Sequence, residues 1–213
     1  MEEMITVKEI DKYFGKKQIL DKISFSMGKG QIYGFVGYNG SGKTVLFKCI
    51  CGFLRVDSGE IWIRDKKMGR EIDLLNNAGI IIETPSFLGA KSGYENLDFL
   101  YRIRNKKDKK YLQKVLEKVG LDPDSGKKVR DYSMGMKQRL AIAQTIMENP
   151  EILILDEPMN GLDKQGVEDM RALFIEEKEK GTTILLASHN KEDINILCDE
   201  VYEMDHGRLS KYR

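Results

Sequence analysis

The chain has 213 residues, 41% of them hydrophobic, which suits one sizeable core and one or two structural units. Lysine and arginine number 35 against 34 acidic residues, so the formal net charge of +1 gives no electrostatic case for binding nucleic acid or an anionic membrane. No apolar run approaches the length of about twenty residues that crosses a bilayer, and the N-terminus is acidic where a secretory signal is basic. We therefore expect a cytoplasmic globular protein.

The first predicted elements are strands. Residues 4–10 alternate between apolar and polar side chains, and residues 23–27 alternate again, which predicts a small antiparallel sheet at the N-terminal end. Tyr13 lies between the two. An exposed aromatic side chain there could stack on an adenine ring, although a half-buried tyrosine on a sheet rim fits the residues equally well.

A glycine-rich run follows the next predicted strand, residues 31–36, and precedes a predicted helix over residues 44–51. It consists of Gly37, Tyr38, Asn39, Gly40, Ser41, Gly42, Lys43 and Thr44, and it has the spacing of the phosphate-binding loop named Walker A. Phosphate oxygens only accept hydrogen bonds, so such a loop must turn backbone N–H groups toward one point, and glycine has no Cβ to obstruct them.

The helix after this loop would add its free first-turn N–H groups and the positive end of its dipole. Lys43 would supply a cation for the β and γ phosphates, and Thr44 a hydroxyl for Mg²⁺. A glycine-rich turn with a surface lysine is the alternative, but the order of strand, loop and helix is the one that nucleotide binding requires.

The three cysteines, Cys49, Cys51 and Cys198, cannot all pair with one another. On a helix, Cys49 and Cys51 would point in different directions, so neither a disulfide framework nor a zinc site is expected. We interpret these residues as small buried or half-buried hydrophobic side chains.

In the middle of the chain the hydrophobic pattern changes from that of strands to that of helices. Residues 60–63 and 78–82 have strand patterns, whereas residues 84–147 carry only helical spacing, which predicts a helical subdomain inserted between strands. Residues 1–83 and 148–213 would then form an α/β core with the antiparallel part. The lysine-rich residues 106–110 are interpreted as a solvated connection between two helices, with a lipid-facing patch as the alternative.

A second candidate for site chemistry follows the apolar residues 152–155, where Asp156 and Glu157 come together. This pattern predicts a strand buried on both faces whose C-terminal end presents acid, which is where open parallel sheets bind ligands. Asp156 would hold Mg²⁺ beside Thr44, leaving Glu157 free to polarise an attacking water.

Another buried strand, residues 183–187, delivers His189 to the same edge, where it could contact a γ phosphate or serve as a helix cap or structural residue. Residues 201–204 and 209–212 predict a closing hairpin.

Taken together, these residues resemble the ATP-binding-cassette ATPases, and the resemblance covers essentially the whole chain in the family's order. Residues 152–156 resemble the Walker B strand with Glu157 as the family's catalytic carboxylate, residues 160–163 are similar to its D-loop, and His189 falls at its switch histidine. Tyr13 falls where the family stacks adenine. The most diagnostic piece is residues 132–139, Tyr-Ser-Met-Gly-Met-Lys-Gln-Arg, which resemble the signature loop; Ser133 would also cap a helix there.

Two departures from the family's pattern stand out. Met134 and Met136 replace the first glycine and the glutamine of the usual Leu-Ser-Gly-Gly-Gln, while Ser133 and Gly135, the members expected to touch a γ phosphate, are kept. Glu83 replaces the Q-loop glutamine; its carboxylate can still offer oxygen to Mg²⁺ or its waters, but it adds negative charge beside phosphate. Residues 82–85 and 132–138 resemble the branch that serves bacterial exporters of peptide antibiotics such as bacitracin or lantibiotics.

The resemblance implies an α/β P-loop NTPase fold, ATP and Mg²⁺ as cofactors, and ATP hydrolysis carried by Lys43, Glu157 and His189. It also implies a homodimer or pseudo-symmetric pair, in which the signature loop of one subunit faces the phosphate loop of the other across ATP. Useful work would require a separate polytopic membrane subunit docked on residues 84–104. The chain would then be peripheral on the inner face of the cell membrane, with export favoured over import and no nucleic acid bound.

Three other interpretations stay open. A cassette protein acting on ribosomes or DNA usually carries two cassettes or a long coiled coil, and this sequence shows neither. A small phosphoryl-transfer kinase that shares only Walker A gives no account of residues 133–139 or of Glu157. A cassette that binds ATP with little turnover is kept open by the altered signature and by Glu83.

Overall fold

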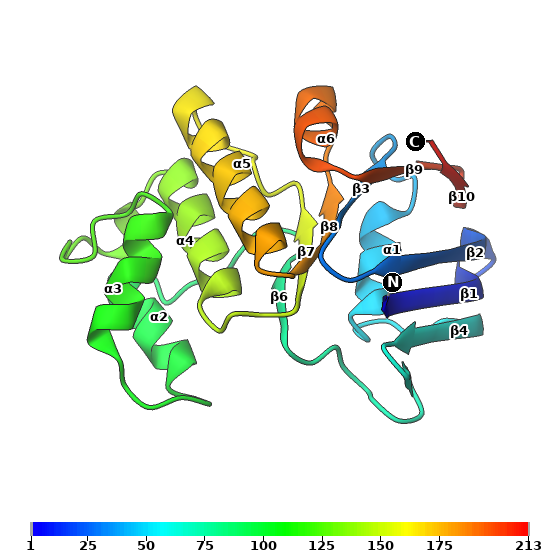
Figure 1. Cartoon of the computed structure of the whole chain (residues 1–213), viewed down its shortest axis with the longest axis horizontal. Coiled ribbons are helices and arrows are strands. Elements are labelled where there is room, and N and C mark those ends of the chain that lie inside the picture. Colours follow the sequence, from blue (N-terminus) through cyan, green and yellow to red (C-terminus); the bar gives the residue numbers. More distant parts are fainter. Residues whose placement is uncertain (1, 213) are drawn as a thin grey trace.

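Two sheets form the framework of the computed structural model, which describes residues 2–212 (Figure 1). The first has the order β2-β1-β4-β5 and is antiparallel throughout. Its strands are β1 (Glu3–Phe14), β2 (Lys17–Gly28), β4 (Ser58–Ile63) and β5 (Lys66–Lys67).

The second sheet has the order β10-β9-β3-β8-β7-β6. Every neighbouring pair in it is parallel except the closing hairpin of β9 and β10. Its strands are β3 (Ile32–Val36), β6 (Ala78–Ile81), β7 (Ile152–Asp156), β8 (Thr183–Ala187), β9 (Glu200–Asp205) and β10 (Arg208–Lys211). The predicted α/β class, with a mostly parallel core sheet and an N-terminal antiparallel part, is confirmed.

Two hydrophobic cores cover the opposite faces of the parallel sheet, and strand β7 shows how they divide. Ile152 and Ile154 belong to the core shared with the antiparallel sheet and helix α1 (Lys43–Ile50), whereas Leu153 and Leu155 belong to the core shared with the other helices. Because successive side chains on a strand point to opposite faces, a strand covered on both sides needs an unbroken apolar run. The polar residues of β7 are therefore confined to its C-terminal end.

The helices of the second core follow β6, β7 and β8. They are α2 (Gly93–Tyr101), α3 (Lys109–Lys118), α4 (Met134–Ile146), α5 (Lys164–Glu179) and α6 (Lys191–Leu197), with a short 3₁₀ turn, η1, at Val129–Asp131. Helices α2, α3 and α4 lie at the end of the molecule opposite the antiparallel sheet (Figure 1). No strand interrupts residues 84–147, as predicted, and the division at residues 83 and 148 stays a prediction. Across residues 2–212, none of the helices has the length and apolarity to cross a bilayer.

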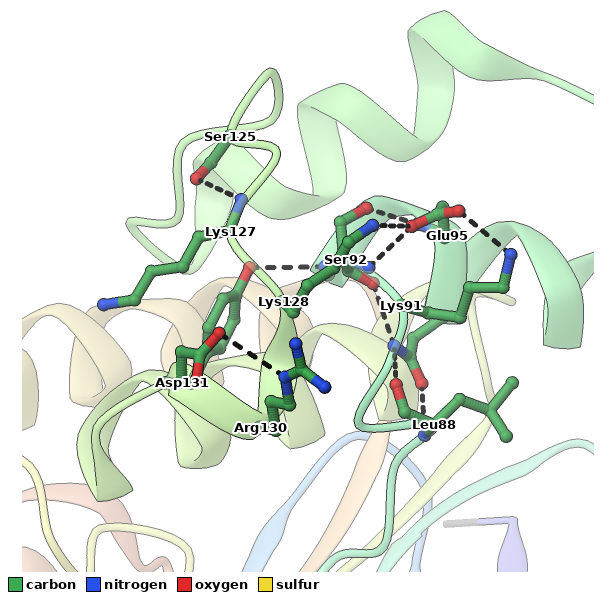
Figure 2. A network of polar contacts seen from close by, with 12 residues as sticks. Leu88, Lys91, Ser92, Glu95, Ser125, Lys127, Lys128, Arg130 and Asp131 are labelled. Atoms are coloured by element: carbon green, nitrogen blue, oxygen red, sulfur yellow. Dashed lines mark hydrogen bonds and ion pairs between the residues drawn. The ribbon is translucent and has the colours of Figure 1, made fainter.

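The start of α2 is held by a network of polar contacts (Figure 2). Ser92 and Glu95 form a capping box, in which the Ser92 hydroxyl accepts from the Glu95 N–H and the Glu95 carboxylate accepts from the Ser92 N–H. Glu95 also pairs with Lys91 and Lys128, and these contacts, led by the Ser92 N–H, lower its pKa to about 2. Since Lys128 precedes the signature residue Ser133, the network ties the start of α2 to that loop.

The cysteines behave as predicted. All three are buried, and burial raises the pKa of Cys49 to about 11 and that of Cys51 to about 12. Helix α6 was not predicted, because it has only seven residues and its start depends on a side-chain contact, in which Asn190 accepts from the Glu192 N–H.

We predict that Gly79→Ala destabilises the fold by about 1–3 kcal/mol, the usual cost of overpacking. A Cβ at Gly79 on β6 would lie 2.2 Å from the carbonyl oxygen of Thr145 on α4. The measurement is the free energy of unfolding from urea titration. Gly126→Ala is the matched control, since a Cβ there meets nothing within 4 Å, and we expect its change to stay within about 0.5 kcal/mol. Equal stability of the two variants would contradict the close packing of β6 on α4.

Candidate functional site

A cavity of about 780 Å³ opens beside the phosphate loop, where α1 begins and strands β6 and β7 end. Its walls come from the β1–β2 hairpin, the loop after β3, the start of α1, the ends of β6 and β7, and the start of α4. The predicted site residues that line it are Asn39, Gly40, Gly42, Lys43, Thr44, Glu83, Asp156 and Glu157. Residues far apart in the sequence thus share one space at the edge where parallel sheets bind ligands.

The phosphate loop depends on glycine at two positions. Gly37 has φ 149°, and a Cβ there would lie 2.3 Å from the carbonyl oxygen of Met204. Gly42 has φ 117° and is the residue before α1, a helix with no side-chain cap and no acidic residue in its first turn. The first-turn N–H groups of α1 are therefore left without a competing side-chain acceptor, as an anion site requires.

Ser41 carries a buried polar atom within the phosphate loop. Its side-chain oxygen is buried and has no hydrogen-bond partner within residues 2–212. Buried polar groups normally have such a partner, because leaving one unpaired costs about 1–3 kcal/mol. Ser41 does not line the cavity, so its hydroxyl would reach a bound phosphate only after a rearrangement of the loop.

Lys43 occupies the loop itself. Its ammonium donates to the carbonyl oxygens of Gly37 at 2.6 Å and Tyr38 at 3.3 Å, and the residue is 7% exposed. Burial lowers the pKa of Lys43, while the charges of Asp156 and Glu157 oppose that shift. The cation is thus held inside the loop, ready to exchange carbonyl partners for phosphate oxygens.

Thr44 and Asp156 form the predicted magnesium pair. The Thr44 hydroxyl donates to Asp156 Oδ2 at 2.6 Å, although the two residues are 112 positions apart. Within the described residues there is no group of three or more His, Cys, Asp or Glu side chains that could enclose a metal. This donor set suits Mg²⁺, which usually takes one or two protein oxygens and completes its shell with phosphates and water.

Glu157 and His189 are also brought together. Glu157 follows β7 and His189 follows β8, and Glu157 Oε2 lies 2.8 Å from His189 Nδ1. The Glu157 N–H donates to the carbonyl oxygen of Ala187 on β8, which fixes the backbone at this point. His189 itself does not line the cavity and is exposed at its rim.

The aromatic residue that lines the cavity is not the one predicted from the sequence to stack on adenine. Phe14 lines the cavity, whereas Tyr13 does not. The two are neighbours on β1 and so point to opposite faces, and the Tyr13 N–H is held by Asp57 Oδ2 at 2.6 Å. Both aromatics were visible in the sequence, but only the register of the β1–β2 hairpin decides which one faces the cavity.

The signature loop lies beside the cavity of its own chain. Ser133 caps α4 by accepting from the Met136 N–H, and neither Ser133 nor Gly135 lines the cavity of its own chain. Met134 and Gln138 do line it, and Gln138 donates to the carbonyl oxygen of Pro158 at 2.8 Å. The remaining predicted loop residues, Gly37, Tyr38 and Ser41, support the loop from outside the cavity lining.

These features define a class of protein. A buried strand, a glycine loop and a helix N-terminus surround a lysine, while a hydroxyl meets a carboxylate at the C-terminal edge of a parallel sheet. That combination belongs to P-loop nucleotide-binding ATPases.

The comparisons with known proteins give the family. A family model described as "ABC transporter" matches residues 20–160. An uncharacterised ABC transporter ATP-binding protein of Bacillus subtilis (YybJ) is 41% identical over 206 residues, which are 97% of this chain and 94% of that protein. The chain belongs to the ABC transporter family and is an ATPase of that family, as the resemblance implied.

Two further relatives have transport roles in their names. The bacitracin transport ATP-binding protein BcrA of Enterococcus faecalis is 39% identical and covers 98% of this chain, which spans 68% of BcrA. The lantibiotic transport ATP-binding protein SrtF of Streptococcus pyogenes is 32% identical over 97% of this chain and 89% of its own length. Among solved structures, the ADP conformation of an ATP-binding cassette of an ABC transporter superposes with a TM-score of 0.82 at 28% identity, covering 99% of this chain and 90% of that one.

Proposed function

We propose that the chain hydrolyses MgATP in an ATP-sealed dimer and thereby drives a separate membrane subunit, with export of peptide antibiotics as the favoured task. The observation that carries this proposal is the arrangement at the cavity, where Thr44 contacts Asp156 and the lining residue Glu157 contacts His189 outside the lining. The family assignment supports ATP as the substrate.

Hydrolysis would divide the work among these residues. Lys43 leaves the loop carbonyls and contacts the β and γ phosphate oxygens. As the terminal phosphate bond breaks, negative charge grows on the ADP leaving group, and the ammonium stabilises it. Glu157 accepts a hydrogen bond from the attacking water, and His189, by donating from Nδ1, orients that carboxylate. Mg²⁺, when held by Thr44 and Asp156, supplies positive charge to the phosphates.

The position of the signature loop supports the dimer. Ser133 and Gly135 do not line the cavity of their own chain, yet Ser133 is exposed at the N-terminal end of α4, where N–H groups favour an anion. A second copy related by a two-fold axis would present these residues to the γ phosphate, so each nucleotide would join two chains. Loss of that phosphate would then release the pair.

Three exposed apolar residues support a docking surface after Glu83. Leu88, Phe99 and Ile103 lie in residues 84–104 and are 47%, 60% and 70% exposed. A partner that covers them would gain apolar burial. With a polytopic membrane subunit as that partner, the chain would sit at the inner face of the membrane, and the names of BcrA and SrtF favour antibiotic peptides as cargo.

Glu157→Gln tests the catalytic assignment. We expect at least about a hundredfold loss of ATPase activity, because the amide cannot act as a base, together with a dimer that forms in MgATP and is absent without nucleotide. Activity is measured by phosphate release and the dimer by light scattering. Glu168→Gln, an exposed acid on α5, is the control and should leave both unchanged. A Glu157→Gln variant that still turns over would remove Glu157 from its role, and one that stays monomeric in MgATP would count against the dimer.

Phe14→Ala tests the aromatic side chain at the cavity. If Phe14 stacks on the adenine base, we expect nucleotide affinity to fall by about five- to a hundredfold, since base stacking on an aromatic ring is worth about 1–3 kcal/mol. Affinity for MgADP is measured by calorimetry. Tyr13→Ala on the other face of β1 is the matched control and should weaken binding less than twofold. The reverse order of effects would return the stacking role to Tyr13.

A further inference from the structure

We propose that Lys48 is a positioning residue that cancels the charge of Glu83 at the cavity and so keeps the affinity for MgATP high. The inference rests on the proposed function, because it concerns how the cavity accepts a polyanionic nucleotide. It assigns Glu83 to a partner within the chain, whereas the resemblance implied that this carboxylate offers oxygen to Mg²⁺ or its waters.

The contact itself is clear. Lys48 Nζ lies 2.5 Å from Glu83 Oε1, which joins helix α1 to the segment after β6. Glu83 has φ 64°, a left-handed conformation that a residue other than glycine adopts when its surroundings hold it. The residue that contacts Lys48 of α1 therefore also has a left-handed backbone conformation.

Helix geometry places Lys48 beside the magnesium pair. Lys48 comes four residues after Thr44 on α1, so the two side chains lie on one face of the helix, one turn apart. That face presents a hydroxyl to Asp156 and an ammonium to Glu83. The same helix thus contacts the segments that follow two neighbouring strands, β6 and β7.

The charges around the cavity give the contact its significance. Among the described residues that line it, three are carboxylates, Glu83, Asp156 and Glu157, and two are lysines, Lys17 and Lys43. Lys48 makes the third cation by its contact with Glu83, so acids and bases balance. Without Lys48, one uncompensated carboxylate would face the phosphates of the nucleotide, and like charges at short range repel.

The solvent exposure of Lys48 and Glu83 limits how much their contact can change the affinity for nucleotide. The side chains of Lys48 and Glu83 are 28% and 65% exposed, so water and salt screen their charges. We therefore expect a modest change in affinity that depends on ionic strength. Between about 0.1 M and about 1 M salt the Debye length falls from about 10 Å to about 3 Å, which should remove most of the effect.

The experiment compares Lys48→Met with the double variant Lys48→Met/Glu83→Gln. Affinity is measured by calorimetry with the magnesium complex of adenylyl imidodiphosphate, which keeps three phosphates and is not hydrolysed. In low salt, Lys48→Met should bind about two- to fivefold more weakly than the unaltered chain, and the double variant should return to within about twofold of it. Lys48→Arg, which keeps the charge, should bind normally, and high salt should erase the defect of Lys48→Met.

Lys118→Met is the matched control, because Lys118 forms a comparable surface pair with Glu176, which does not line the cavity. Its affinity should be unchanged. Unaltered affinity of Lys48→Met would overturn the inference while leaving the proposed function intact. A double variant as weak as Lys48→Met would also overturn it, since Lys48 would then act on the nucleotide itself. Failure of the unaltered chain to bind the probe would instead count against the proposed function.

Discussion

The hydrogen bond between Thr44 and Asp156 is the interaction on which the rest of the site depends. It joins the first turn of α1 to the end of β7. Helix α1 follows β3, and the sheet order separates β3 from β7 by β8. Both ends are held by burial, since β7 is covered on both faces and α1 packs into the core beneath the antiparallel sheet. With this span fixed, the glycine loop, Lys43 and Glu157 face one space, and an Mg²⁺ ion there would need only phosphate oxygens and water to complete its shell.

The site is assembled from residues at the ends of neighbouring strands. Strands β6, β7 and β8 run parallel, and the residues after each of them, Glu83, Glu157 and His189, therefore arrive at the same edge. In β6, β7 and β8, apolar side chains fill the two cores, Thr183 is a buried polar residue at the start of β8, and the candidate site residues stand at or after the strand ends. Function and packing are consequently separated along each strand, and substitutions within the apolar runs act on stability before they act on chemistry.

The sequence predicts the parts of this arrangement that local patterns encode. The short unbroken apolar run before Asp156 favours a strand covered on both faces, and the spacing of Gly37, Gly42 and Lys43 has few structural uses other than phosphate binding. These features were predicted because each is a pattern within a short contiguous stretch of the sequence. The comparisons confirm the family that the motifs indicated.

Features that depend on register or on distant partners could not be predicted in this way. The choice between Tyr13 and Phe14 rests on which face of β1 meets the cavity, a fact set by pairing with β2. The contact of Glu83 with Lys48 joins residues 35 positions apart and depends on the backbone conformation of Glu83. No periodicity in the sequence carries that information.

The low pKa of Glu95 has a consequence for how the molecule responds to its surroundings. A folded-state pKa of about 2, below the usual 4.5, means that the stabilising contribution of this carboxylate is complete above pH 4.5 and fades only as the pH falls toward 2. Its bonds to Ser92, Lys91 and Lys128 therefore persist through any mild acidification. The start of α2 therefore keeps its contact with Lys128, five residues before Ser133, over the pH range in which most proteins are handled.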